Sequence, residues 1–185
     1  MTAGLTYGQL HAMAASEEYR RLTPEEAVAE LFETAREDVY RYLLTLGLVP
    51  AQAQEATQEV FLRLYAALRK GQRIGNMRAW IFRVAHNHGL TLRGQERRWR
   101  PFEPDPEMRI PDEAGSPEQR LIERERWTNL GHAVASLSPQ QRQCLHLRTE
   151  GFRYREIAGI LGISDSSVGE FLRRAIAKLR KALDG

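Results

Sequence analysis

Apolar residues recur along this chain at intervals of three and four, the period of an amphipathic helix. No stretch alternates between apolar and polar residues as a half-buried strand would. The pattern predicts one helix from Pro24 to about Leu46, a second from about Ala51 to Arg69 and a third from near Asn76. On the third helix the predicted buried side comprises Met77, Trp80, Ile81, Val84, Ala85 and His88. We therefore expect an all-α protein.

Short polar motifs mark where two helices begin. The sequence TPEE at residues 23–26 has the form of a capping box with proline at the first helical position, and SPQQ at 138–141 repeats it. Gly47 and Pro50 end the first predicted helix, and Gly71 follows the second. These boundaries agree with the periodicity.

The last part of the chain, from Phe152 to Leu183, has the pattern of two helices joined by a tight turn. Gly162 suits the turn because glycine accepts positive φ, and Ser164 can cap the second helix. The predicted apolar stripes are Tyr154, Ile157, Ala158 and Leu161 on the first helix, and Val168, Leu172, Ile176, Leu179 and Leu183 on the second. This is the pattern of a helix-turn-helix, whose usual partner is the DNA major groove. An ordinary helical hairpin is the alternative.

The net charge is only +3, but the charges are segregated along the chain. Residues 63–100 hold ten basic and one acidic residue, a balance of +9, and residues 151–183 have a balance of +4. Between them, residues 101–125 have a balance of −5. Two basic blocks favour two contacts with one polyanion, although solvated helix faces would have the same composition.

Two small helical domains joined by an extended, acidic, proline-rich linker account for this layout. Five of the eight prolines fall between Pro101 and Pro117, without helical periodicity. We predict an N-terminal tail at 1–22, a first domain at 23–100, the linker at 101–125 and a second domain at 126–185.

Several classes of function are disfavoured. Cys144 is the only cysteine, so the chain forms no internal disulfide and has no two-cysteine zinc pattern. His86 and His88 are two residues apart on a predicted helix and face different sides, so they cannot chelate a metal together. We expect no cofactor, no metal and no catalytic residues. No apolar run approaches a membrane span and no signal peptide is evident, so we expect a cytoplasmic protein.

Three motifs in order carry a family resemblance: EATQEVFLRLYAAL at 55–68, NMRAWIFRVAHNHGLTLRGQERR at 76–98 and LSPQQRQCLHLRTEGFRYREIAGILGIS at 137–164. Together they resemble the extracytoplasmic-function group of bacterial sigma factors. The resemblance implies a dissociable subunit that directs core RNA polymerase to promoters and helps to open them. It implies sigma domain 2 at 23–100 and sigma domain 4 at 126–185, and it leaves open whether an anti-sigma factor binds the chain. It also implies that the linker enters the polymerase interior, although a plain tether is equally compatible with its composition.

The resemblance assigns polymerase binding to the second helix. Gln58, Glu59 and Phe61 match the family's Gln-Glu-x-Phe element, which docks on the coiled coil of the β′ subunit, while domain 4 would meet the β flap. Glu55 replaces the family's usual aspartate. The predicted polymerase-binding residues are Glu55, Gln58, Glu59, Phe61, Leu62 and Arg63. Phe61 could instead belong to the domain core.

The third helix and the loop before it, residues 69–78, would recognise and melt the minus-ten element, in duplex form and as the displaced non-template strand. Asn87 matches the family asparagine expected at the opened base, whereas Thr91 replaces the family's aspartate or asparagine. The predicted minus-ten residues are Arg83, His86, Asn87, Thr91, Arg93, Arg97 and Arg98, the cations following phosphates. Trp80 is expected in the core.

The helix-turn-helix would read the minus-thirty-five element. Its second helix has Ser167, Val168, Gly169, Glu170 and Phe171 where relatives often have additional cations, so we expect an altered upstream specificity. The predicted contacts are Arg153, Arg155, Ser166, Ser167, Glu170, Phe171, Arg173, Arg174 and Lys178. The alternative function is a conventional helix-turn-helix regulator that acts without being a polymerase subunit.

Overall fold

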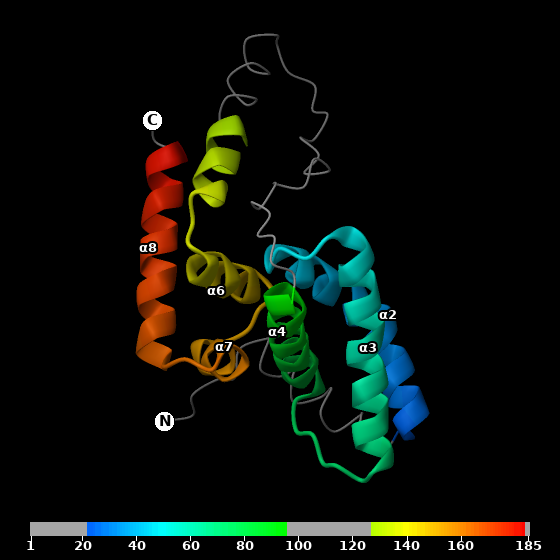
Figure 1. Ribbon diagram of the computed structural model, residues 1–185. Coiled ribbons are helices and arrows are strands. Elements are labelled where there is room, and N and C mark those ends of the chain that lie inside the picture. The colour runs from blue at the N-terminus through cyan, green and yellow to red at the C-terminus, as the bar shows by residue number, and fades with distance from the viewer. Residues whose placement is uncertain (1–21, 96–126, 184–185) are drawn as a thin grey trace, which may run out of the picture.

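The computed structural model describes residues 22–95 and 127–183, and all regular structure in these two stretches is helical (Figure 1). The helices are α2 (Pro24–Thr45), α3 (Pro50–Arg69), α4 (Met77–Gln95), α6 (Pro139–Thr149), α7 (Tyr154–Leu161) and α8 (Asp165–Leu183). Residues 127–135 are also helical. The all-α prediction is confirmed. The predicted linker, residues 1–21 of the tail, and Arg97 and Arg98 lie outside the described residues.

Helices α2, α3 and α4 form the N-terminal unit, and their ends are where the sequence predicted them. At the start of α2 the Glu26 amide donates to Thr23 Oγ1 (3.3 Å) and the Thr23 amide donates to Glu26 Oε2 (2.9 Å), a complete capping box. Pro50 is the first residue of α3, where its missing N–H costs no helical hydrogen bond. Large side chains from all three helices fill the core: Leu31, Val39, Tyr42, Leu43, Val60, Leu64, Ile81 and Phe82 are buried.

Residues 127–183 form the C-terminal unit, which contains the helix-turn-helix. Gly162 ends α7 in the left-handed conformation (φ +68°), and the Ser167 amide donates to Ser164 Oγ at 3.1 Å, capping α8. The apolar stripe of α8 is shorter than predicted. Its buried residues are Val168, Leu172 and Ala175, whereas Ile176 and Leu183 are 41% and 48% exposed. Helices α6 and α7 both pack against α8.

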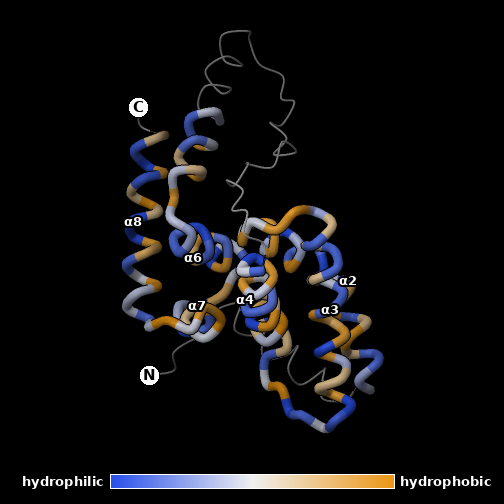
Figure 2. Tube along the Cα trace, in the orientation of Figure 1, coloured by the Kyte–Doolittle hydropathy of each residue, from blue (hydrophilic) through white to orange (hydrophobic). Residues whose placement is uncertain are grey.

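The two units pack against each other, with α4 between them (Figure 1). Helix α4 contacts α2 and α3 in its own unit and α7 in the other, while α2 also contacts α6. The rings of Phe82 and Phe152 meet edge to face across this boundary, 4.9 Å between centroids. Buried residues of both units therefore join in one continuous core, drawn from helices that carry both apolar and polar residues along their length (Figure 2).

Candidate functional site

The outer side of α3 displays five of the six predicted polymerase-binding residues. Glu55, Gln58, Leu62 and Arg63 are exposed and Glu59 is half-buried. They fall at positions i, i+3, i+4, i+7 and i+8, so they share one surface of the helix. Glu59 Oε1 accepts from Arg63 Nε at 2.7 Å, and Leu62 is 62% exposed. An apolar side chain in a charged, hydrogen-bonding surround is the composition of a protein-docking surface.

Phe61 does not belong to this surface. It is 4% exposed, and its ring packs edge to face on Phe32 with 5.0 Å between centroids. The prediction that Phe61 contacts a partner directly is contradicted by its burial, and the alternative, a core residue, is what the structure has.

A second exposed surface runs along α4. Asn87 and Thr91 are exposed one turn apart. The Thr91 hydroxyl donates to the backbone carbonyl of Asn87 at 2.9 Å. Arg83, one turn earlier, donates from Nε to the carbonyl of Gly159 in α7 at 2.8 Å. Arg93 donates from Nη1 to the Leu46 carbonyl at 3.2 Å and is thereby held against its own unit.

His86 is buried rather than placed along a nucleic-acid path. It is 5% exposed, and its Nδ1 lies 2.9 Å from the Tyr42 hydroxyl. Burial lowers the pKa of His86, so the ring is neutral near pH 7. The predicted phosphate contact of His86 is therefore contradicted. The sequence analysis placed His88 on the buried side of this helix. In the structure His86 points into the core, and His88 is only half-buried.

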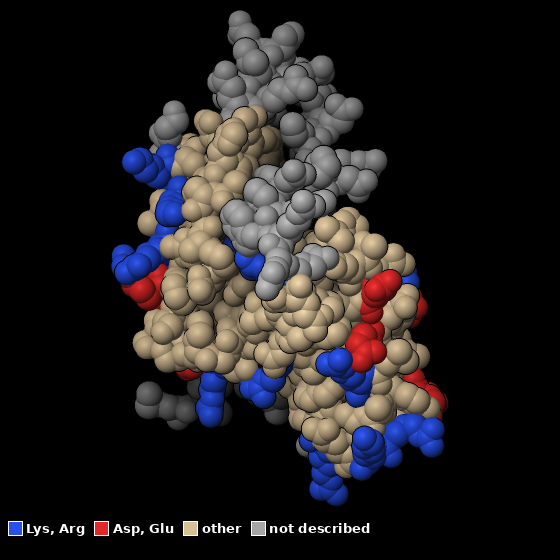
Figure 3. Space-filling view, in the orientation of Figure 1, with Lys and Arg blue, Asp and Glu red and all other residues tan. Residues whose placement is uncertain are grey.

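Basic side chains gather at the lower end of the N-terminal unit, where α3 leads into α4, and along α8 (Figure 3). At the first of these places Arg69, Lys70 and Arg73 are exposed in or beside the loop at 69–78 that the resemblance assigns to the minus-ten element. Arg69 also lies over the Tyr65 ring, 5.8 Å from its centroid. The end of α3 and the loop after it thus bring exposed cations close to an aromatic side chain.

The α7–α8 surface holds its charges in an ion-pair network. Glu170 Oε1 accepts from Arg174 Nε at 2.6 Å and from Arg173 Nη2 at 2.9 Å. Hydrogen bonds from Arg173 and then Arg174 lower the pKa of Glu170. The other predicted minus-thirty-five residues differ in exposure: Arg153, Arg155 and Ser166 are exposed and Ser167 is half-buried. Phe171 packs partly against the core. Lys178 donates to the Ser136 carbonyl at 3.0 Å.

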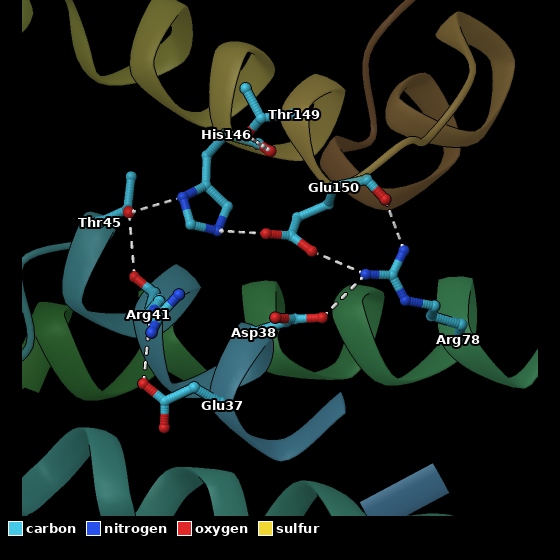
Figure 4. Close-up of polar contacts among 8 residues, drawn as sticks. All are labelled: Glu37, Asp38, Arg41, Thr45, Arg78, His146, Thr149 and Glu150. Atoms are coloured by element: carbon cyan, nitrogen blue, oxygen red, sulfur yellow. Dashed lines mark hydrogen bonds and ion pairs between the residues drawn. The ribbon is translucent and has the colours of Figure 1, made fainter. Parts of the chain in front are cut away.

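The sequence did not reveal a polar cluster at the boundary of the two units (Figure 4). Arg78 Nη2 lies 3.0 Å from Asp38 Oδ2 and 2.7 Å from Glu150 Oε2. Burial, and then the neighbouring Asp38 carboxylate, raise the pKa of Glu150, while Arg78 opposes that shift. The partners are 40 and 72 residues apart in sequence, so no local spacing could have indicated them.

Cys144 and the possible metal-ligating side chains are the remaining reactive groups among the described residues. Cys144 is buried, and burial raises the pKa of its thiol to about 11. Among the described residues no group of three or more His, Cys, Asp or Glu side chains could hold a metal ion. Within the same ranges no helix is long and apolar enough to cross a membrane.

Comparison with known proteins bears on both units. Residues 31–99 match the family Sigma-70 region 2, and residues 128–179 match Sigma-70, region 4. The ECF RNA polymerase sigma factor SigL of Mycobacterium tuberculosis is 31% identical over 156 residues, which cover 78% of this chain and 82% of SigL. The ECF sigma factor SigE of Mycolicibacterium smegmatis is 31% identical over 157 residues; these cover 83% of this chain but only 60% of SigE.

A solved structure shares the fold. The sigma factor RpoE of Bartonella quintana, in complex with the anti-sigma factor NepR, superposes with a TM-score of 0.61 at 17% identity, covering 84% of this chain and 96% of that one. The two sigma regions, in the order that the motifs indicated, together with the identity to SigL, place this chain in the extracytoplasmic-function (ECF) family of RNA polymerase sigma factors.

Proposed function

We propose that this protein binds core RNA polymerase and directs promoter-specific initiation, recognising and melting the minus-ten element with residues 23–100 and reading the minus-thirty-five element with residues 126–185. The observation that carries the proposal is the pair of exposed surfaces on successive helices. One displays Leu62 among charged groups on α3, and the other displays Asn87 on α4. The proposed site of action is the cytoplasm, and the polymerase performs all the chemistry.

Polymerase docking is assigned to the α3 surface, through the β′ coiled coil. Leu62 is the proposed apolar anchor, because a side chain that is 62% exposed gains burial only from a partner. Glu55, Gln58, Glu59 and Arg63 supply the polar rim. Phe61 acts indirectly, because it anchors α3 on α2 through Phe32. The C-terminal unit would meet the β flap.

Minus-ten recognition is assigned to α4 and the loop before it. Asn87 can donate and accept hydrogen bonds at the edge of an opened base, and the exposed Arg69, Lys70 and Arg73 can neutralise the phosphates of the displaced strand. Thr91 extends this surface by one turn. Arg97 and Arg98, outside the described residues, remain proposed phosphate contacts, and Arg83 becomes one when it leaves Gly159.

Minus-thirty-five recognition is assigned to α7 and α8, with Arg153 and Arg155 on phosphates and Ser166 and Ser167 at the start of the second helix. Because Glu170 neutralises part of the charge of Arg173 and Arg174, we expect an upstream preference unlike that of relatives with unpaired cations there. Selection from randomised duplex DNA tests this expectation, and enrichment of the common family consensus would contradict it.

An anti-sigma factor is a further proposed partner. The support is the likeness of fold to RpoE bound to NepR, in which that sigma factor is held by such a protein.

The proposal is tested with purified core polymerase. We expect the chain to co-elute with core enzyme and to produce new transcripts from a genomic library in vitro. Leu62→Asp should abolish co-elution. Ala29→Asp, which introduces the same residue at an exposed α2 position away from the docking surface, should not. Sequence-specific duplex binding without co-elution or transcription would instead establish a conventional helix-turn-helix regulator.

A further inference from the structure

Glu170 holds two arginines at the exposed side of α8, the second helix of the helix-turn-helix. Its Oε2 accepts from Arg173 Nε at 3.0 Å and its Oε1 accepts from Arg173 Nη2 at 2.9 Å, so this arginine binds both carboxylate oxygens. Oε1 also accepts from Arg174 Nε at 2.6 Å. These charge-assisted hydrogen bonds are strong and directional, and together they orient the carboxylate.

This network contributes little to the stability of the fold. The side chains of Arg173 and Arg174 are 70% and 60% exposed, and that of Glu170 is 39% exposed. Ion pairs between exposed side chains three or four residues apart stabilise a helix only slightly. The value of the network therefore lies in how it presents the carboxylate at the surface.

Glu170 lies on the side of α8 that faces away from the core. Ser166, Glu170 and Arg173 fall at positions i, i+4 and i+7, so they share one side of the helix. Val168 and Leu172, on the opposite side, are buried. The first turns of the second helix are the part of a helix-turn-helix that meets the base edges in the major groove. Basic side chains continue along α8 (Figure 3), so the carboxylate is carried by a surface that attracts DNA.

A carboxylate in the major groove distinguishes the bases because it can only accept hydrogen bonds. Guanine presents the acceptors N7 and O6 there, thymine presents O4, and adenine has the acceptor N7 beside its amino group. Cytosine presents its N4 amino group with no acceptor beside it. Hydrogen bonds from Arg173 and then Arg174 lower the pKa of Glu170, so the side chain is ionised near pH 7. An ionised Glu170 therefore suits cytosine best.

We propose that Glu170 reads a cytosine in the minus-thirty-five element, and that Arg173 and Arg174 are positioning residues that orient its carboxylate and screen it from the phosphates. The inference rests on the proposed function, in which α7 and α8 bind this element. One position of the element is then a C·G pair with cytosine on the strand that Glu170 contacts. The two arginines also neutralise fewer phosphates than unpaired arginines would, because each phosphate competes with the carboxylate.

The test uses holoenzyme assembled from the full chain and core polymerase. The minus-thirty-five element of a promoter mapped by transcription in vitro is randomised, and the bound templates are sequenced. The parent chain should enrich cytosine at one position by about fivefold or more, the lower end of the discrimination that a good base contact provides. Glu170→Gln should replace this cytosine by adenine on the same strand, because an amide donates to N7 and accepts from the N6 amino group. Glu33→Gln, the same charge change at an exposed α2 position, is the matched control and should leave the preference unchanged.

Two further variants test the arginines. Glu170→Ala should lose the cytosine preference and free both cations. Binding to duplex without the element should then fall more steeply with salt, the slope of log K against log[salt] becoming more negative by about 1–2. Arg173→Lys/Arg174→Lys keeps both charges but lacks the planar guanidinium, so it should reduce the cytosine preference roughly twofold or more at an unchanged slope. The midpoints of thermal unfolding should stay close to that of the parent chain, since the pairs are exposed.

The possible outcomes separate this inference from the proposed function. A cytosine preference that persists in both Glu170→Gln and Glu170→Ala, or an enriched element with no cytosine that depends on Glu170, would overturn the reading role. An unchanged salt slope in Glu170→Ala would overturn the screening by the arginines. A parent holoenzyme that enriches no upstream sequence would contradict the proposed function of α7 and α8 and this inference with it.

Discussion

The Tyr42 hydroxyl lies 2.9 Å from Nδ1 of His86, and both side chains are buried at the centre of the N-terminal unit. The bond joins α2 to α4 across 44 residues of sequence. Tyr42 is 0% exposed, and its ring also contacts Phe82, with 5.5 Å between centroids. The position of α4, and with it the direction in which Asn87 points, therefore depends on this pair.

The first prediction concerns that hydrogen bond. Tyr42→Phe keeps the ring but leaves Nδ1 of His86 without its partner, so the free energy of unfolding should fall by about 1–3 kcal/mol. Urea unfolding followed by circular dichroism measures the change. The double variant Tyr42→Phe/His86→Leu removes both polar groups and should recover part of the loss. An unchanged stability of the single variant would show that the bond contributes nothing.

Neighbouring residues of α3 should behave in opposite ways. Phe61→Ala should lower the free energy of unfolding by about 3–5 kcal/mol because it empties a core position. Leu62→Ala should change it by less than about 0.5 kcal/mol, since that side chain is mostly exposed, yet it should weaken binding to core polymerase. Thermal or urea unfolding and a binding titration distinguish the two effects. Equal destabilisation by both substitutions would contradict the assigned orientation of α3.

Gly89 allows α4 to approach α2 closely. A Cβ at this position would lie 2.7 Å from Leu46 Cδ1 and 3.0 Å from Leu43 Cδ2, and both leucines are buried. Gly89→Ala should therefore destabilise the protein by about 1–3 kcal/mol, despite the higher helix propensity of alanine. Gly94→Ala on the same helix, where a Cβ meets nothing within 4 Å, is the control and should be neutral or stabilising. Differential scanning calorimetry of both variants gives the comparison.

Stability should decline in mild acid because of His146. Burial lowers the pKa of this ring from 6.5 to about 4; Asp38 opposes the shift, whereas Arg41 and Arg78 reinforce it. The folded protein keeps the ring neutral, so this contribution is complete above pH 6.5 and is lost as the pH falls toward 4. Between pH 7.5 and 5.5 the loss should be about 1 kcal/mol.

Urea unfolding at the two pH values checks this dependence. His146→Asn should reduce the loss of unfolding free energy between pH 7.5 and 5.5 by about 1 kcal/mol. The smaller contributions of His86 and His88, whose pKa values are also lowered by burial, remain. Glu150, whose Oε1 lies 3.8 Å from Nε2 of His146, has a raised pKa, so its protonation adds to the stability of the folded protein as the pH falls toward its ordinary pKa of 4.5. This effect opposes that of His146, which is why pH 5.5 is the lower limit of the experiment. An identical pH dependence in the variant would contradict the assignment.

The proposed role of Asn87 predicts a selective kinetic defect. Its side chain is exposed, so Asn87→Ala should leave the free energy of unfolding within about 0.5 kcal/mol of the parent chain. With core polymerase, promoter opening should decrease roughly tenfold, as expected for the loss of a hydrogen-bonded base contact, while formation of the closed complex is little changed. Permanganate reactivity measures opening, and gel retardation at low temperature measures the closed complex. Equal losses in both assays would argue for a general DNA-binding role.

The sequence by itself determined the local features of this protein. Helix starts at Thr23 and Ser138, the turn at Gly162 and the outward stripe around Leu62 depend on residues within one or two helical turns of each other, and short-range spacing predicts such features well. The order of the three motifs likewise indicated the family, because it needs only the linear sequence.

Only the tertiary structure decided which side chains are covered and how the two units meet. His86 and Phe61 sit on helix sides whose exposure depends on the register of packing against α2, and a shift of about one residue around a helix exchanges buried and exposed positions. The Arg78 cluster forms only because α2, α4 and the end of α6 come together in the fold. Arg78 is 40 residues from Asp38 and 72 residues from Glu150 in sequence, and no local spacing predicts contacts over such separations. Long-range burial and charge pairing depend on the whole set of packed helices, which is why the Arg78 cluster could not be predicted from the sequence.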